Sequence, residues 1–159
     1  MPKTFIAALV IVALVGLLVL MVVSWRRRVK GQSHIPAPAS RPTTLGEPIR
    51  SFPGLYLATT PAGEPLNRIA VHGLGFRSRT TVDVFPAGVV LLDDVFIPAA
   101  SITGSGTASW TIDRGVEPDG LNVIAWDLGT TSLESYFRLD DPAGFIAATS
   151  VFAAQTGRS

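Results

Sequence analysis

The apolar run near the N-terminus constrains this chain more than any other feature. From Phe5 to Val23 every residue is apolar or glycine, FIAALVIVALVGLLVLMVV. A helix of this length rises about 28 Å, close to the ~30 Å hydrocarbon core of a bilayer. It also satisfies its own backbone hydrogen bonds inside lipid. The run predicts a transmembrane helix over residues 5–24, preceded by a short tail of residues 1–4.

A cleaved signal peptide is the competing interpretation of this run. It would need a shorter apolar stretch with a small-x-small cleavage site directly after it. Trp25 and three arginines follow instead, and the first such pattern, Ala37-Pro38-Ala39, lies downstream of the cationic block. We therefore expect the helix to be retained as a membrane anchor.

The charges that flank the run predict its orientation. Four basic side chains follow it directly, against Lys3 and the terminal amine before it. The positive-inside rule then places the N-terminus outside and the C-terminal domain in the cytoplasm, as a single-pass protein of the plasma membrane. The basic block is also compatible with attraction to anionic lipid. The predicted membrane-interface residues are Trp25, Arg26, Arg27, Arg28 and Lys30.

The rest of the chain has the opposite charge balance. Five of the thirteen basic residues lie in residues 1–30, which leaves eight basic residues against all twelve acidic ones in residues 31–159. A mildly acidic body is a poor nucleic-acid binder, because phosphate binding needs a cationic face. The chain also has no cysteine, which excludes disulfides, thiolate catalysis and cysteine-ligated metals.

The segment after the helix has the composition of a linker. Residues 31–50 contain four prolines, few apolar residues and no hydrophobic periodicity. Such a stretch cannot bury a core and is expected to be an extended, semi-stiff spacer. We therefore predict a basic juxtamembrane segment and proline-rich linker over residues 25–50, followed by a folded domain over residues 51–157.

Short apolar runs separated by Gly, Pro and Asp turns follow the linker, as in a mainly β domain. Several alternate with period two, such as Val82 and Val84 against Thr81 and Asp83. Trp110 and Trp126 are expected to fill or edge the core. The predicted strands are 54–60, 66–72, 80–85, 88–93, 94–98, 107–113, 121–128 and 131–139.

The last segment predicts one amphipathic helix. Asp141 is a suitable N-cap with Pro142 at the first helical position, and Gly157 is a plausible stop. The stripe predicted to face the strands is Phe145, Ala148, Thr149 and Phe152. About seven antiparallel strands closed by one C-terminal capping helix is the outline of a pleckstrin-homology-like (PH-like) barrel.

A family resemblance supports this outline. The segments NRIAVHGLGFRSRTTVDVFPAGVVL, FIPAASI, SWTIDRGVEPDGLNVIAWDLG and ESYFRLDDP follow the apolar run, the arginines and the proline-rich stretch. In this order they resemble a family of small actinobacterial single-pass membrane proteins with a bacterial PH-like domain. Genes of that family commonly lie among those for pyrimidine biosynthesis. The resemblance implies fold and topology, and it implies no activity.

The tetrapeptide GLGF at residues 73–76 matches the carboxylate-binding loop of PDZ domains. In those domains a strand pairs with the peptide and a later helix lines the groove. Here the only helix expected after it is the C-terminal one. We therefore interpret Gly73 and Gly75 as turn glycines between two strands.

Three residues near this turn are the candidate ligand-binding residues: His72, Arg77 and Arg79. PH domains use basic residues at an early strand connection to bind phosphoinositide headgroups, so Arg77 and Arg79 are candidate phosphate contacts by analogy. Solvated surface arginines are the plainer alternative, and the acidic balance of the domain counts against strong lipid binding.

The sequence offers no constellation for catalysis. His34 lies in the linker, so only His72 could act as a base in the folded part, and no partner motif accompanies it. Asp93-Asp94 reads as a hairpin turn and Asp140-Asp141 as a helix cap rather than a cation site. We expect no catalytic residues, metal or cofactor.

These observations together predict a membrane-anchored, non-enzymatic adaptor whose cytoplasmic PH-like domain docks a protein partner. The alternative is an anionic-lipid binding module that uses Arg77 and Arg79.

Overall fold

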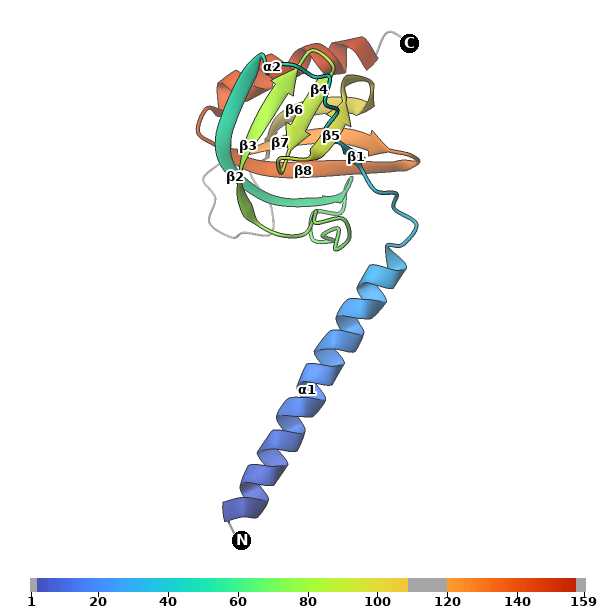
Figure 1. Cartoon of the computed structure of the whole chain (residues 1–159), viewed down its shortest axis with the longest axis vertical. Coiled ribbons are helices and arrows are strands. Elements are labelled where there is room, and N and C mark those ends of the chain that lie inside the picture. The colour runs from blue at the N-terminus through green and yellow to red at the C-terminus, as the bar shows by residue number, and fades with distance from the viewer. Residues whose placement is uncertain (1–2, 109–119, 157–159) are drawn as a thin grey trace. The chain divides into compact units, whose positions relative to one another are not determined.

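The computed structural model describes residues 3–108 and 120–156. The chain divides into two compact units, one ending at His34 and the other beginning at Ile35. Figure 1 labels the helices and strands of both units. Each unit is described below by itself.

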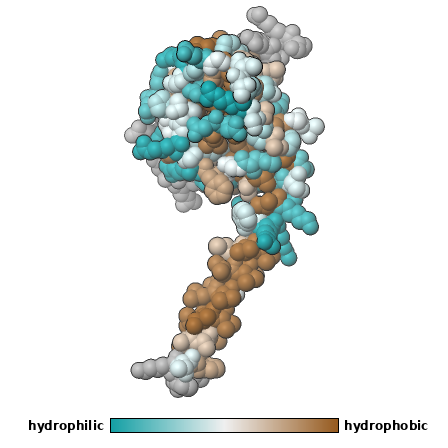
Figure 2. Space-filling view, viewed as in Figure 1, coloured by the Kyte–Doolittle hydropathy of each residue, from teal (hydrophilic) through white to brown (hydrophobic). Residues whose placement is uncertain are grey.

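The first unit contains one long helix, α1 (Lys3–Gly31). Its large apolar side chains are exposed around the whole helix, and Figure 2 shows it as an apolar rod. A helix that is apolar on every side suits lipid rather than a half-buried position. The segment Thr4–Gly31 has a mean hydropathy of 3.3 over its most apolar window, so it is long and apolar enough to cross a membrane.

The second unit is built on a single antiparallel sheet of eight strands, which confirms the mainly β prediction. The strand order is β1-β5-β4-β3-β2-β8-β7-β6, and a 3₁₀ turn (Ala99–Ser101) leads into β6. The strands are β1 (Ala39–Ser40), β2 (Arg50–Pro61), β3 (Ser78–Phe85), β4 (Gly88–Leu91), β5 (Val95–Pro98), β6 (Ile102–Ala108), β7 (Leu121–Leu128) and β8 (Thr131–Leu139).

The core lies on the concave face of this bent sheet and is closed at one end by α2 (Pro142–Thr156). Phe145, Thr149 and Phe152 of α2 are buried, as the predicted stripe requires. The Gly144 amide donates to Asp141 Oδ1 over 2.9 Å, which confirms the N-cap. Trp126 is 1% exposed and belongs to the core.

Two predicted strands differ from the structure. Residues 66–72 form a turn-rich connection rather than a strand, because backbone amides bond locally, as when the Asn67 amide donates to the Glu64 carbonyl oxygen over 2.9 Å. Ile69 buries its side chain in the core while Leu66 stays exposed. The strand predicted over 107–113 is β6 instead, which begins at Ile102 and is described as far as Ala108. Trp110, the end of the strand predicted over 107–113, and Gly157 lie outside the described residues.

The compact unit begins at Ile35, earlier than the expected boundary at residue 51. Residues 35–49, here called the strap, lie on the sheet instead of forming a spacer. Ile35 is 4% exposed within the core, and β1 pairs with β5 through Ala39 opposite Phe96 and Ser40 opposite Val95. The sheet thus gains β1, which the sequence did not predict, and lacks the strand predicted over residues 66–72. The burial of Ile35 and a few backbone hydrogen bonds therefore hold the strap on the sheet, although its composition is proline-rich.

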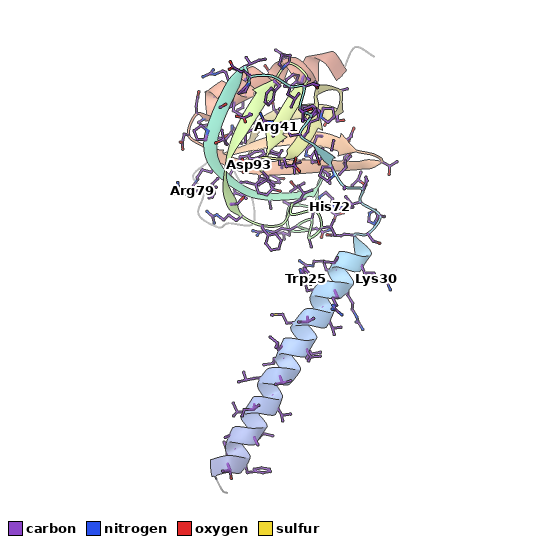
Figure 3. All side chains as sticks on the ribbon, viewed as in Figure 1. Trp25, Lys30, Arg41, His72, Arg79 and Asp93 are labelled. Carbon is purple, nitrogen blue, oxygen red and sulfur yellow. The ribbon has the colours of Figure 1, made fainter. Side chains whose placement is uncertain are left out.

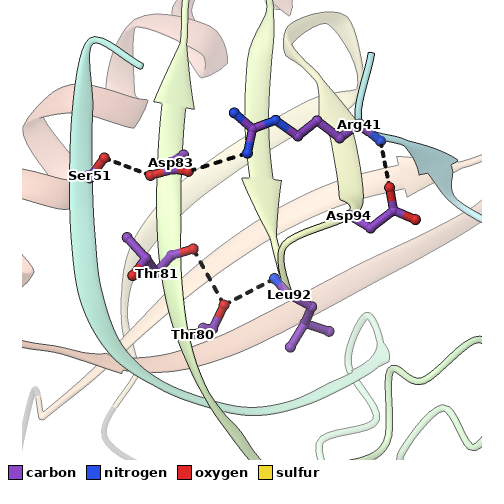
Figure 4. Close-up of polar contacts among 7 residues, drawn as sticks. All are labelled: Arg41, Ser51, Thr80, Thr81, Asp83, Leu92 and Asp94. Atoms are coloured by element: carbon purple, nitrogen blue, oxygen red, sulfur yellow. Dashed lines mark hydrogen bonds and ion pairs between the residues drawn. The ribbon is translucent and has the colours of Figure 1, made fainter. Parts of the chain in front are cut away.

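Arg41 fastens the strap to the outer face of the sheet (Figure 4). Its backbone amide donates to the carbonyl oxygen of Asp94 over 2.7 Å. Its guanidinium lies 3.9 Å from Asp83 Oδ2 and 5.4 Å from the centre of the Phe85 ring. The Ser51 hydroxyl donates to the other oxygen of Asp83 over 2.6 Å. The strap therefore covers part of the outer face of β3 to β5.

Candidate functional site

Two arginines flank one leucine on the outer face of the sheet. In the strand register, Leu55 of β2 lies opposite Arg79 of β3 on one side and opposite Arg138 of β8 on the other. Directly opposed residues of an antiparallel pair point to the same face of the sheet. Both arginines are exposed. Two guanidinium groups are thus presented on either side of an apolar floor.

A second row of the same face carries an acid. Pro53 lies opposite Thr81, and its carbonyl oxygen accepts a hydrogen bond from the Asp140 amide over 3.1 Å. Asp93, in the β4–β5 turn, completes the rim. Its neighbour Leu92 is held there because the Leu92 amide donates to Thr80 Oγ1 over 3.1 Å (Figure 4).

These residues line a surface groove of about 540 Å³, here called the β2–β3–β8 groove. Arg79 and Asp93, both labelled in Figure 3, lie on its rim. Within the described parts of the chain, its four charged side chains form no ion pair with one another. The lining residues are Pro53, Gly54, Leu55, Arg79, Thr80, Thr81, Asp93, Arg138 and Asp140.

The side chains of the groove can contact a ligand that carries both charged and apolar groups. Its guanidinium groups can donate paired hydrogen bonds to a carboxylate or phosphate, and its carboxylates can accept from a basic group. Leu55 adds apolar surface between them. Such a mixed set of charges discriminates among ligands by pattern as well as by net charge.

The structure brings only one of the three candidate ligand-binding residues into this groove. Arg79 lines it, whereas Arg77 and His72 do not. Arg77 is exposed just before β3, and His72 lies well away from Arg79 in Figure 3. The sequence interpretation also missed Arg138. Arg138 reaches the groove through the pairing of β8 with β2, which nothing in the sequence indicated.

The GLGF motif lies in the connection between β2 and β3, residues 62–77, here called the β2–β3 connection. Leu74 is fully buried, and its carbonyl oxygen accepts from the Thr59 amide over 3.0 Å. Gly73 has a φ of 75°. A Cβ on Gly75 would lie 2.6 Å from the Ile69 carbonyl oxygen. The glycines therefore permit a tight fold that plugs Leu74 into the sheet.

A buried network of hydrogen bonds links Leu74 to the core. The donor and the acceptor of each bond follow from the two ends of the network. Trp126 Nε1 can only donate and contacts Ser135 Oγ over 3.0 Å, while the Leu74 carbonyl can only accept and lies 2.6 Å from Tyr56 Oη. Ser135 must then donate to Thr59 Oγ1, and Thr59 to Tyr56. The hydroxyls of Tyr56, Thr59 and Ser135 are therefore all hydrogen-bonded.

His72 attaches the β2–β3 connection to the strap. Its Nε2 atom lies 2.9 Å from the Ile35 carbonyl oxygen. Because a carbonyl accepts only, Nε2 carries the proton and donates. His72 adopts a positive φ of 58° to reach this position. In the structure His72 therefore forms a hydrogen bond within its own domain.

Two tyrosines have shifted pKa values. Burial raises the pKa of Tyr56 well above its usual value. Burial, together with the hydrogen bond to the Glu134 carboxylate and its charge, raises the pKa of Tyr136 to about 12. Tyr136 lies on the outer face beside Leu57 and Leu121. Both hydroxyls stay protonated near neutral pH.

The two pairs of adjacent aspartates lie in a turn and at the start of a helix. Asp93 and Asp94 lie in the β4–β5 turn, where Asp93 has a φ of 66°, and Asp141 caps α2. Across residues 3–108 and 120–156, no group of three or more metal-ligating side chains is brought together.

Comparison with known protein families gives a match over most of the second unit. The sequence pattern of a family described as bacterial PH domain-like matches residues 35–155. The match begins at Ile35, the residue at which the compact unit begins. No curated protein matches the chain.

Proposed function

The chain belongs to the bacterial PH domain-like family, and from this membership we propose that it is a membrane-anchored, non-enzymatic interaction module that docks a protein partner close to the bilayer. PH-like domains generally serve as binding modules. The anchor in this proposal is α1, whose length and hydropathy suit a single span. The four basic residues after the apolar run orient the domain toward the cytoplasm.

The mixed charge of the β2–β3–β8 groove is the observation that carries the choice of a protein partner. Two arginines and two aspartates line it, and the part of the chain after residue 30 has more acidic than basic residues. A polyanionic lipid headgroup would be repelled by Asp93 and Asp140. A protein surface can match both signs and also cover Leu55.

Photo-crosslinking from the groove tests this function. A photoreactive phenylalanine analogue at Leu55, in the full chain in its native membranes, should give a discrete protein adduct. The adduct should be lost in the Arg79→Glu/Arg138→Glu variant, because charge reversal removes the complementary contacts. The same probe at Ala147, exposed on α2, is the matched control. An adduct that forms equally from both positions would contradict docking in the groove.

Anionic-lipid binding through Arg77 and Arg79 is the second candidate. It is favoured by the position of both side chains, since Arg77 is exposed at the end of the β2–β3 connection and Arg79 is exposed at the start of β3. The same crosslinking experiment separates the two candidates by the mass of the adduct. A phospholipid adduct that is lost in Arg77→Ala/Arg79→Ala would support the lipid, and a protein adduct would support the partner.

A further inference from the structure

Two large apolar side chains protrude from the compact unit into water. Leu66 is 79% exposed and Phe76 is 64% exposed, more than any other large hydrophobic side chain described from Ile35 onward. Both belong to the β2–β3 connection. A single exposed apolar residue is ordinary on a protein surface, but two in one segment beside basic residues require an explanation.

The connection cannot turn these side chains inward, because its backbone is held at several points. The Ile69 amide donates to the Thr59 carbonyl oxygen over 2.8 Å, and the Thr59 amide donates to the Leu74 carbonyl oxygen over 3.0 Å. Ile69 and Leu74 are both fully buried. Leu66 and Phe76 are therefore presented to the outside by a folded segment.

The chain between α1 and the residue that holds the β2–β3 connection is short. The last residue of α1 is Gly31, and only residues 32–34 join it to Ile35, a distance of at most ~14 Å in a fully extended chain. His72 of the connection is hydrogen-bonded to Ile35. The segment that presents Leu66 and Phe76 is thus attached to the residue at which the chain arrives from the helix.

The height of Ile35 above the bilayer that α1 is proposed to span is also limited. Gly31 lies about 12 Å along the helix axis beyond Val23, the last residue of the apolar run. The headgroup layer of one leaflet occupies roughly 5–8 Å above the hydrocarbon core. Ile35 therefore lies at most ~26 Å above the hydrocarbon core, a height at which a domain that leans on the bilayer brings its surface to the interfacial layer.

We propose that the β2–β3 connection is a second membrane contact, in which Leu66 and Phe76 insert into the interfacial layer of the bilayer that α1 spans. Insertion removes two apolar side chains from water. Arg77 follows Phe76 directly and brings a positive charge to the level of the lipid phosphates. This inference rests on the proposed membrane anchor and is independent of the protein partner.

The absence of cysteine from the chain permits a direct test. Single cysteines at Leu66, Phe76 and, as control, Ala143 on α2 are labelled with an environment-sensitive fluorophore in the full chain, reconstituted in phosphatidylcholine nanodiscs. Ala143 is also exposed, but it lies on the helix that closes the other end of the sheet in Figure 1. Labels at 66 and 76 should show blue-shifted emission and at least about threefold less quenching by aqueous iodide than the label at 143.

Each other outcome would overturn the inference in a recognisable way. Equal quenching at all three positions would place the connection in water while leaving the anchor and the partner proposal intact. Protection that requires added phosphatidylglycerol would show that charge alone makes the contact. A chain that does not enter the nanodiscs would overturn both this contact and the membrane anchor. Circular dichroism of each labelled variant checks that the sheet is unchanged.

Discussion

The Nε2 atom of His72 lies 2.9 Å from the carbonyl oxygen of Ile35, so the β2–β3 connection is attached to the first residue of the compact unit. His72→Ala removes this hydrogen bond and should lower the free energy of unfolding by about 1 kcal/mol. Chemical denaturation of the full chain in detergent measures it. His34→Ala is the matched control, since His34 Nδ1 is hydrogen-bonded to the Gly31 carbonyl oxygen at the end of α1 and lies outside the compact unit. An equal loss in both variants would contradict the structural role of His72.

Ile35 and Ile49 lie at the two ends of the strap and differ in exposure, at 4% and 61%. Ile35→Ala should cost about 2–4 kcal/mol of unfolding free energy, because it leaves a cavity in the core. Ile49→Ala should change it by less than about 0.5 kcal/mol. Thermal unfolding of both variants measures the difference. Similar small effects would mean that the strap is the loose spacer that its composition suggests.

Gly75 packs against the backbone of Ile69, where a Cβ would lie 2.6 Å from a carbonyl oxygen. Gly75→Ala should therefore destabilise the domain by about 1–3 kcal/mol. Gly106 of β6 has no neighbouring atom within 4 Å of an added Cβ, and Gly106→Ala should be neutral or slightly stabilising. Comparison of their denaturation midpoints tests whether GLGF is a packing motif.

Stability should fall in alkaline solution between about pH 10 and pH 12. The folded-state pKa of Tyr136 is raised to about 12, so over this range the folded protein keeps a proton that the unfolded chain has lost. The unfolding free energy then decreases as pH rises. Burial raises the pKa of Tyr56 as well, so its effect has the same sign. Denaturation at pH 9 and pH 11 should show a smaller loss in Tyr136→Phe than in the parent protein.

The proposed topology predicts which cysteines an impermeant reagent can reach in intact cells. Ala100→Cys, on the exposed 3₁₀ turn after β5, should be labelled by a membrane-impermeant maleimide only after the cells are permeabilised. Pro2→Cys should be labelled without permeabilisation, because the positive-inside rule places the N-terminus outside. The reverse pattern would contradict a cytoplasmic domain.

The fold class was predictable because its signals are local. The alternation around Val82 and Val84, and the stripe that ends at Phe152, each report which side of an element faces the core. The strap was not predictable, since a proline-rich composition conceals the burial of one side chain, Ile35, which only tertiary packing decides. Residues 66–72 were mistaken for a strand for the same reason. Ile69 is buried by tertiary packing in the core and not as part of a strand that pairs with a neighbour.

The candidate site depended on strand pairing, which the sequence does not contain. Arg79 was identified from its place beside a turn. Arg138 was missed because it meets Leu55 only through the register of β2 and β8, which includes an irregularity between Tyr56 and Ala58. The pattern of charges along one strand does not show which residues of another strand lie beside it in the sheet.

The three residues between Gly31 and Ile35 limit where this domain can meet a partner. A domain on a long flexible tether samples a large volume, whereas a linker of three residues would hold this one within a few nanometres of the proposed membrane anchor. With α1 in a bilayer, as we propose, a partner would have to reach the membrane surface. The rate of their encounter would then be governed by lateral diffusion and by how many copies share the same patch of bilayer.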